Sequence, residues 1–331
     1  MKTPEVVVVT GASAGVGRAT AVAFAQKGAS VGLIARGQAG LEAAAAEVER
    51  AGGRPLVLPL DVSSPDDVER AAERVERELG PIDVWVNDAM LTIFSPFSQI
   101  RPEEFRRVTE VTYLGYVYGT MSALKRMVPR DSGVVVQVGS ALAYRSIPLQ
   151  AAYCGAKFGI RGFTDSVRTE LLHRHSGVHI TMVQLPAVNT PQFSWAKTNL
   201  PLTPRPVPPV FQPEVIAEAI MWAAAHRKRE VIVGMPSLAA IWANKFIPGL
   251  LDRYLARTGY RSQQTDRPVD PGRQDNLFSP LAGGHRTHGE FDDEAHRVSW
   301  EFQAAAYKNW IIAAGILAAG VLFARRLASD D

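Results

Sequence analysis

The sequence predicts an α/β fold in which a doubly wound parallel sheet of about seven strands precedes a C-terminal helical extension. Three observations support this prediction. Short runs of apolar, β-branched residues alternate with longer stretches of helical periodicity over residues 1–236. The first of these runs leads directly into a glycine-rich turn. A final apolar run, at residues 309–324, stands apart from the alternating pattern.

Strands and helices are predicted to alternate along this part of the chain. Apolar β-branched runs place the strands at residues 6–9, 30–34, 55–60, 82–87, 133–139, 179–185 and 231–233. Helical periodicity places the helices at residues 15–27, 39–51, 65–79, 102–128, 151–175 and 213–226. Because a parallel pair of strands needs a long crossover connection, this order favours a Rossmann-type sheet covered on both faces. The periodicity fails over residues 189–213, where prolines gather, and a lid, a substrate loop or disorder is expected there.

The chain is predicted to divide into three parts. They are a dinucleotide-binding and catalytic domain at residues 1–236, an amphipathic helix with a polar connector at 237–303, and an apolar helix at 304–326. The apolar side chains of residues 237–257 lie near helical spacing and either pack on the core or enter a membrane interface. Residues 258–297 are polar, with scattered Gly, Pro and His, so a solvated connector is expected.

Composition excludes several classes of function. The formal net charge is only +3, so nucleic acid is not an expected partner. The single cysteine, Cys154, cannot form an internal disulfide, and no oxidising compartment is indicated. The histidines and carboxylates of residues 284–296 match no defined ligand spacing, so no metal site is predicted. The N-terminal residues lack a signal-peptide pattern, and the catalytic domain is therefore expected in the cytoplasm.

The final apolar run, "NWIIAAGILAAGVLFARR" from Asn309 to Arg326, favours a membrane anchor. Its uncharged part of about 16 residues would reach about 24 Å as a helix, short of the roughly 30 Å core of a bilayer. However, the run is apolar on all sides, and Trp310 and the terminal arginine pair suit the two interfaces. A membrane-associated protein is therefore predicted, with a soluble cytoplasmic protein as the alternative.

The stretch "VVVVTGASAGVG", residues 6–17, places a glycine-rich turn between a buried strand and a helix. A helix N-terminus offers free backbone N–H groups and the positive end of the helix dipole, so it can bind an anion. Gly11, Gly15 and Gly17 would let a pyrophosphate approach the backbone closely. The order of strand, turn and helix therefore predicts a dinucleotide site.

A second group of residues, Ser140, Tyr153 and Lys157, predicts acid–base chemistry. Tyr153 and Lys157 are four residues apart on a predicted helix, so their side chains share a face. A phenol has an ordinary pKa of about 10, and a nearby ammonium group favours the phenolate. Ser140 ends a predicted strand and is expected to hydrogen-bond the carbonyl or hydroxyl that reacts.

With these motifs, the chain resembles the short-chain dehydrogenase/reductases, in the shorter branch of that family. The resemblance rests on "TGASAGVG" (10–17), "LDV" (60–62), "NDA" (87–89), Ser140, "YCGAK" (153–157) and "LPAVNT" (185–190). It implies that Ser140 holds the substrate oxygen and that Tyr153 transfers the proton. It also implies that Lys157 binds the nicotinamide ribose and lowers the pKa of Tyr153. A homodimer or homotetramer is a further implication.

The resemblance also implies how a dinucleotide is held. Asp61 would contact the adenine, and residues 186–190 would close over the nicotinamide. The cofactor-binding set is Gly11, Ser13, Ala14, Gly15, Val16, Gly17, Arg36, Asp61, Val62, Asn87, Ala89, Tyr153, Lys157, Pro186, Val188 and Thr190. Arg36 stands after the second strand, where an acidic residue would favour NAD(H). Because its guanidinium suits a 2′-phosphate, NADP(H) is expected over NAD(H).

Two positions depart from the family pattern. Met90 stands where a glycine usually lets the backbone pass close to the cofactor. Thr112 stands where relatives have an asparagine that supports a water leading to the lysine. Its hydroxyl can accept and donate, and a backbone carbonyl is the alternative route, so the proton relay is expected to be slowed and not lost.

The predicted function is that of an NADP(H)-dependent oxidoreductase that interconverts a secondary alcohol and a carbonyl. A lipophilic small-molecule substrate is inferred from the membrane anchor and from the apolar side chains of residues 193–211. The alternative is a catalytically weak or inactive NADP(H)-binding scaffold or sensor at a membrane.

Overall fold

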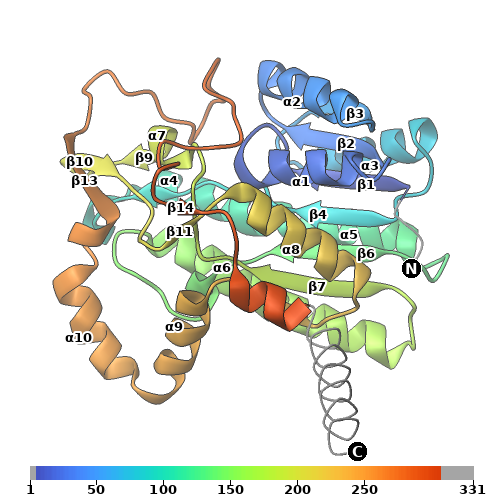
Figure 1. Cartoon of the computed structure of the whole chain (residues 1–331). Coiled ribbons are helices and arrows are strands. Elements are labelled where there is room, and N and C mark those ends of the chain that lie inside the picture. Colours follow the sequence, from blue (N-terminus) through green and yellow to red (C-terminus); the bar gives the residue numbers. More distant parts are fainter. Residues whose placement is uncertain (1–4, 307–331) are drawn as a thin grey trace, which may run out of the picture.

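The centre of the molecule is a seven-stranded sheet in which every neighbouring pair is parallel. The computed structural model describes residues 5–306. The sheet consists of β1 (Val6–Thr10), β2 (Ser30–Ala35), β3 (Arg54–Pro59), β4 (Val84–Asn87), β6 (Val134–Val138), β7 (His179–Gln184) and β12 (Glu230–Ile232). Its order is β12-β7-β6-β4-β1-β2-β3 (Figure 1). The chain order of the strands reverses between β1 and β4, and such a switch point leaves a crevice at the carboxyl ends of these strands. The predicted doubly wound sheet of about seven strands is confirmed.

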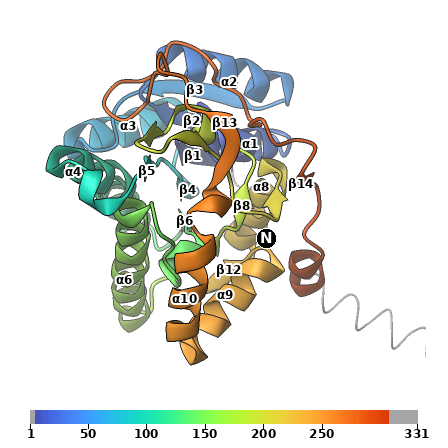
Figure 2. The same cartoon turned by 90° about the vertical axis from the view of Figure 1, so that its left-hand side faces the viewer.

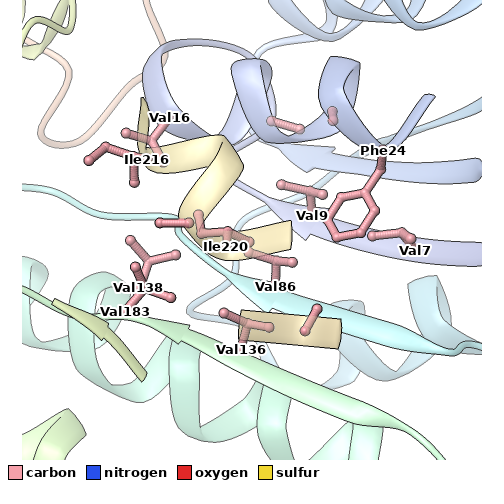
Figure 3. Packing of buried hydrophobic residues seen from close by; sticks show 14 of the residues in the cluster. Val7, Val9, Val16, Phe24, Val86, Val136, Val138, Val183, Ile216 and Ile220 are labelled. Atoms are coloured by element: carbon pink, nitrogen blue, oxygen red, sulfur yellow. The ribbon is translucent and has the colours of Figure 1, made fainter. Parts of the chain in front are cut away.

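Helices cover both faces of the sheet (Figures 1 and 2). One face carries α1 (Gly15–Ala25), α2 (Gln38–Arg50) and α8 (Pro213–Ala225), and the other carries α3 (Pro65–Glu78), α5 (Gly115–Met127) and α6 (Ala151–His173). Successive side chains of a strand point to opposite faces, so Val7 and Val9 enter the first layer and Val8 enters the second. Figure 3 shows Val7 and Val9 packed beside Phe24 of α1. Both layers are therefore built from the alternating apolar runs.

The predicted helix at residues 102–128 contains a wider turn in its middle. It consists of α4 (Pro102–Thr109), the π-helical turn η2 (Glu110–Leu114) and α5. A π turn takes up one more residue than an α turn and is often found at functional sites. The turn changes which side chains of the following helix face the sheet, and this affects the site described below.

Shorter elements gather over the carboxyl ends of the strands. They are β5 (Ile93–Phe94), η1 (Phe97–Gln99), η3 (Ala141–Ala143), β8 (Ala187–Val188), α7 (Gln192–Trp195), β9 (Lys197–Thr198), β10 (Leu202–Pro204), β11 (Val210–Phe211), α9 (Met235–Phe246), α10 (Pro248–Thr258), η4 (Arg261–Gln263), β13 (Gln264–Pro268) and β14 (Ala295–His296). The proline-rich stretch 189–213 is thus ordered, because its short strands pair with β5, β8, β13 and β14.

The segment between β13 and β14, residues 269–294, is called the strap here. It runs toward α2 and then back to β14, across the nucleotide side of the sheet (Figures 1 and 2). The sequence predicted a solvated connector in this part of the chain, and the structure differs. Leu277 and Phe291 are buried, and together they fix the strap to two separate apolar clusters. Two isolated apolar residues in a polar segment do not form a helical or strand periodicity, so the sequence did not show that this segment is anchored.

The predicted membrane anchor at residues 304–326 lies outside the described residues from 307 onward, so it stays a prediction. Within residues 5–306, no helix combines the length and the apolar character needed to cross a bilayer. The predicted division of the chain at residues 236 and 303 also stays a prediction. The strap nevertheless packs on the sheet and its helices, so it adds a wall to the first part of the chain.

Candidate active site

A cavity of about 410 Å³ opens at the carboxyl ends of β1, β4 and β6. It extends from the glycine-rich turn, past Tyr153 and Lys157, to the proline-rich segment at residues 205–209. The sequence-predicted residues that line it are Gly11, Ser13, Ala14, Gly15, Val16, Arg36, Asp61, Val62, Ala89, Tyr153, Lys157, Pro186, Val188 and Thr190. The fold therefore brings together, around one cavity, residues that are up to 179 positions apart in the sequence, from Gly11 to Thr190.

The glycine-rich turn is packed too closely for side chains. A Cβ at Gly17 would lie 2.5 Å from the carbonyl oxygen of Gly11, and a Cβ at Gly11 would lie 3.0 Å from Ala89. Gly11 and Gly15 also have positive φ values of 75° and 56°, which favour glycine. Gly15 and Val16, at the start of α1, line the cavity beyond this turn. These features fit the pyrophosphate of a dinucleotide, which needs bare backbone and the positive end of a helix.

Two guanidinium groups lie at the end of β2. Arg36 donates hydrogen bonds to the carbonyl oxygens of Asn276 and Leu277, and burial lowers its pKa. Arg107 of α4 donates to Asp61, to Ser63 and to the same Leu277 oxygen. Burial opposes ionisation of Asp61, but hydrogen bonds from Ser63 and Arg107 hold its pKa below the ordinary value. This end of the cavity therefore offers positive charge for a phosphate.

The strap supplies a wall that the sequence did not predict. Its Arg286 carbonyl oxygen accepts a 3.1 Å hydrogen bond from the N–H of Gly15, and its His285 carbonyl accepts one of 2.9 Å from Arg18. The His285 ring packs over Gly40 of α2 and against Trp195. The strap therefore covers the end of the cavity that fits the adenosine half of a dinucleotide.

Tyr153 lines the other end of the cavity, and Ser140 hydrogen-bonds it. Ser140 follows β6 and is fixed twice: its N–H donates to Gln184 over 2.7 Å, and its hydroxyl accepts from the N–H of Leu142 over 3.1 Å. Burial raises the pKa of Tyr153, and the hydrogen bond with Ser140 opposes this shift. The tyrosine is therefore a proton donor at neutral pH unless added positive charge stabilises its phenolate.

Lys157 is only 2% exposed, and its ammonium nitrogen lies 5.5 Å from the centre of the Tyr153 ring. Burial lowers the pKa of Lys157, while the carboxylate of Asp88 favours the ammonium form. Burial likewise raises the pKa of Asp88, and Lys157 and the N–H of Gly17 oppose that shift. The site thus places the carboxyl group of Asp88 and the amine of Lys157 together in a buried region beside the glycine-rich turn and the catalytic tyrosine candidate.

Besides Ser140, three predicted residues do not line the cavity. Gly17 packs against Gly11 and Asp88 behind the turn. Asn87 is fully buried. Its side-chain amide accepts a hydrogen bond from Trp85 and donates hydrogen bonds to Thr120 and Gln137, so it joins β4 to α5 and β6. The Thr112 hydroxyl accepts from the N–H of Leu91 and donates to the carbonyl of Leu91, each over 2.9 Å. Asn87 and Thr112 therefore support the walls of the site from behind.

Several cavity-lining residues escaped the sequence reasoning. They are Leu142, Ile147, Gln150, Pro236 and Ser237 near Tyr153, and Asn276, Pro280, Leu281 and His285 of the strap. None of them belongs to a motif. Met90 lines the cavity as well, so the space that a glycine would leave is filled by a side chain.

The histidine-rich part of the strap is held by ordinary polar contacts. His288 lies 2.9 Å from Glu214 and 2.9 Å from Asp292, and the His285 ring bonds the carbonyl of Leu281. Within the described part of the chain, no group of three or more His, Cys, Asp or Glu side chains is arranged to hold a metal ion.

Comparisons with known proteins agree with this geometry. A family model described as short chain dehydrogenase matches residues 5–199. The chain is 31% identical over 326 residues to the uncharacterized oxidoreductase YxnA of Bacillus subtilis (strain 168). This similarity covers 97% of this chain and 90% of that protein. It is 30% identical over 223 residues to the 3-dehydrosphinganine reductase of Danio rerio, with 65% of this chain and 67% of that protein covered.

Among solved structures, a metagenomic short-chain oxidoreductase in complex with NADP is similar. Its TM-score is 0.59 and its identity 27%, over 69% of this chain and 96% of that one. The similarity to YxnA spans nearly all of the chain, whereas this structure matches a smaller share.

Proposed function

The chain belongs to the short-chain dehydrogenase family, and on that premise we propose that it is an NADP(H)-dependent oxidoreductase interconverting a secondary alcohol and a carbonyl. One observation carries the proposal. Tyr153, which hydrogen-bonds Ser140, and Lys157 line one end of a cavity whose other end is a close-packed glycine-rich turn. Such a cavity suits a dinucleotide with its reactive ring beside a proton donor.

Each side chain has a defined task in this reaction. The bound cofactor supplies a hydride to the carbonyl carbon or accepts one from the alcohol. In reduction, Ser140 holds the carbonyl oxygen, and Tyr153 donates its phenolic proton as negative charge develops there. In oxidation, the phenolate of Tyr153 removes the hydroxyl proton. The ammonium of Lys157 favours that phenolate because it is a positive charge nearby.

NADP(H) is favoured over NAD(H) by the charge at the end of β2. Arg36 lines this end of the cavity, and Arg107 lies beside it, bonded to Asp61 and Ser63. A carboxylate free to accept from the ribose hydroxyls does not follow Ala35, since Arg36 stands there. The similar metagenomic oxidoreductase, crystallised with NADP, is in keeping with this choice.

A lipophilic substrate is favoured by the walls beside Tyr153. Leu142, Ile147 and Phe193 line the cavity, together with the prolines of residues 206–209. The name of the Danio rerio relative, 3-dehydrosphinganine reductase, is in keeping with a lipophilic carbonyl. An apolar wall contributes affinity in proportion to the apolar area that a substrate buries.

Membrane association is the corresponding proposal for location, with the catalytic domain in the cytoplasm. Besides the apolar run at 309–324, the helices α9 and α10 expose Trp242, Phe246, Leu250 and Tyr254, and Lys245 lies against the Trp242 ring. Exposed aromatic residues beside cations suit the headgroup region of a bilayer. The alternative, a soluble cytoplasmic enzyme, predicts that the full-length protein stays in the supernatant when membranes are pelleted.

Substituting Tyr153→Phe tests the catalytic proposal on full-length protein in detergent. We expect NADPH to bind more tightly than NADH in fluorescence titrations of wild type and variant alike. Turnover of a lipid-like ketone should fall by about a hundred- to ten-thousandfold in the variant, the range for loss of a general acid. Binding of NADPH without any Tyr153-dependent turnover, across a broad screen of carbonyls, would instead favour the scaffold or sensor.

A further inference from the structure

The ammonium group of Lys157 has two close partners inside the protein. Its Nζ atom donates to the carbonyl oxygen of Val138 over 2.7 Å and to the hydroxyl of Tyr116 over 3.0 Å. The same Nζ lies 4.7 Å from the centre of the Tyr116 ring, at a distance typical of a cation–π contact. Lysine has three ammonium hydrogens, so these partners fix two of them and leave one for the cavity.

Tyr116 is itself held rigidly. It is 1% exposed, packs with Ile160 and Met182 between α5, α6 and β7, and donates its own hydroxyl proton to Val138 over 3.1 Å. Val138 ends β6, so Tyr116 and Lys157 are both tied to the strand that carries Ser140. The result is a closed group of three polar atoms, two donors converging on one carbonyl.

The π-helical turn η2 brings Tyr116 to this position. Thr112 lies within the turn and uses its hydroxyl entirely on Leu91, so that hydroxyl does not reach Lys157. Tyr116 follows four residues later, on α5, and its long side chain reaches the lysine. The residue in the expected relay position is thus tied to the neighbouring loop, and a different residue contacts the lysine.

We propose that Tyr116 is a positioning residue that acts through Lys157, its hydroxyl taking the place that the family resemblance gives to a water beside the lysine. The inference rests on the proposed function, since it concerns the same site. Tyr116 and Val138 direct two N–H groups of the ammonium inward. The third then points toward Tyr153 and the ribose of the cofactor, which restricts the lysine to its working position without a mobile solvent molecule.

Tyr116 also favours the charged form of the lysine. The titratable groups around Lys157 are Asp88 from the loop after β4, Tyr153 from α6 and Tyr116 from α5. Burial lowers the pKa of Lys157, and the hydroxyl and ring of Tyr116 stabilise the ammonium against this effect. Burial raises the pKa of Tyr116, so its hydroxyl stays neutral and keeps both hydrogen bonds.

The substitution Tyr116→Phe removes the hydroxyl and retains the ring. Because a hydrogen bond to a charged group is lost, we expect kcat for alcohol oxidation at neutral pH to fall about ten- to hundredfold, with KM changed by less than about threefold. The sign of the pH effect follows from the charge. A less stable ammonium favours the Tyr153 phenolate less, so the rise of the oxidation rate with pH should move to higher pH.

Tyr118→Phe is the matched control. Tyr118 lies two residues further along α5 and packs on the apolar layer with α3, so it loses the same hydroxyl on the same helix away from the lysine. Thermal denaturation of both variants measures any structural loss. An equal oxidation rate and pH profile in wild type, Tyr116→Phe and Tyr118→Phe would overturn the proposal, and so would equal losses in both variants.

NADPH binding gives a second measurement that needs no turnover. Lys157 donates to the ribose in the proposed complex, so the affinity should begin to fall at a lower pH in Tyr116→Phe than in wild type, over a titration from about pH 6 to about pH 10. A wild type without turnover would refute the proposed reaction alone, because the binding profiles still test the lysine. Turnover that depends on Tyr153 with coincident binding and rate profiles for Tyr116→Phe would refute only the role of Tyr116.

Discussion

On the sheet side of the nucleotide cavity, the backbone is packed so tightly that Gly17 has no room for a side chain. On the strap side, by contrast, backbone carbonyls from residues 276–286 accept hydrogen bonds from Gly15, Arg18 and Arg36. The first wall is fixed by steric exclusion. The second is fixed by hydrogen bonds and by two buried side chains, Leu277 and Phe291. Steric exclusion demands one residue type, while a backbone hydrogen bond accepts almost any. The two walls therefore differ in how visible they are in the sequence and in how easily they should open.

The largest effect should come from breaking the sheet wall with Gly17→Val. A Cβ would approach the Gly11 carbonyl to 2.5 Å, and backbone cannot give way cheaply. We expect a loss of at least about 2 kcal/mol in the free energy of unfolding, together with loss of NADPH binding. Urea denaturation and fluorescence titration measure the two effects.

Gly162→Ala is the control for this substitution, because an added Cβ there meets no atom within 4 Å. Alanine is the better helix former, so that variant should be as stable as the wild type or slightly more so. If Gly17→Val bound NADPH normally, the close packing of the turn would have no part in the cofactor site.

A smaller and more local effect is expected from breaking the strap wall with Leu277→Ala. Leu277 is 1% exposed, and truncating a buried leucine typically costs about 2–5 kcal/mol. Since no strand of the seven-stranded sheet lies in the strap, we expect most of this loss to appear as faster hydrogen exchange in residues 269–294. NADPH affinity should fall by about tenfold, because the cover over the adenosine end loosens.

Phe278→Ala provides the matched comparison, since Phe278 is the next residue along the strap and its side chain is 52% exposed. It should leave exchange in the strap and NADPH affinity unchanged. Uniformly faster exchange throughout the sheet in Leu277→Ala would contradict the separation of the two walls, because the strap would then be part of a single cooperative unit.

The smallest effect concerns the link between the walls, in which Arg107 bonds both Asp61 and the Leu277 carbonyl. The pKa of Asp61 in the folded protein lies below its ordinary value of 3.8. Its ion pair with Arg107 therefore stabilises the fold at pH values above 3.8, and this stabilisation is lost as the pH falls through the folded-state pKa. Below about pH 4, hydrogen exchange in the strap, corrected for intrinsic pH dependence, should quicken about two- to fivefold, as expected for a partly exposed pair.

Asp61→Asn should show the faster exchange already at neutral pH and lose the acid-induced step. Asp66→Asn is the control, because Asp66 is an exposed carboxylate in the first turn of α3, the helix that follows Asp61. This variant should behave like the wild type. A strap that loosens equally with pH in Asp61→Asn would assign the acid sensitivity to other groups.

The sequence predicted the sheet and most of the site because those features restrict residue type. Only glycine suits Gly11 and Gly17, and few residues other than tyrosine and lysine suit the pair at Tyr153 and Lys157. Asn87 was expected at the cofactor, but its side chain can point either way from a strand end, and packing against Thr120 and Gln137 decides it. Side-chain direction at such a position depends on tertiary neighbours that a single sequence does not identify.

Tyr116 and the strap escaped prediction for related reasons. The partner of Lys157 depends on the π-helical turn η2, which shifts the helical register between Thr112 and Tyr116 and has no clear sequence signal. The strap has only two anchoring apolar residues among polar ones, so its composition resembles that of a solvated connector. In both cases the information lies in a contact between distant segments and not in a local pattern.

The strap's position late in the chain has a consequence for the order in which the molecule is made. During synthesis the N-terminal part of a chain emerges and folds first. All seven strands of the sheet, through β12 at Ile232, leave the ribosome before the strap does. The nascent protein therefore passes through a stage in which the glycine-rich turn is formed and its nucleotide crevice is still uncovered. That stage gives a dinucleotide an opportunity to enter before residues 269–294 arrive and narrow the entrance.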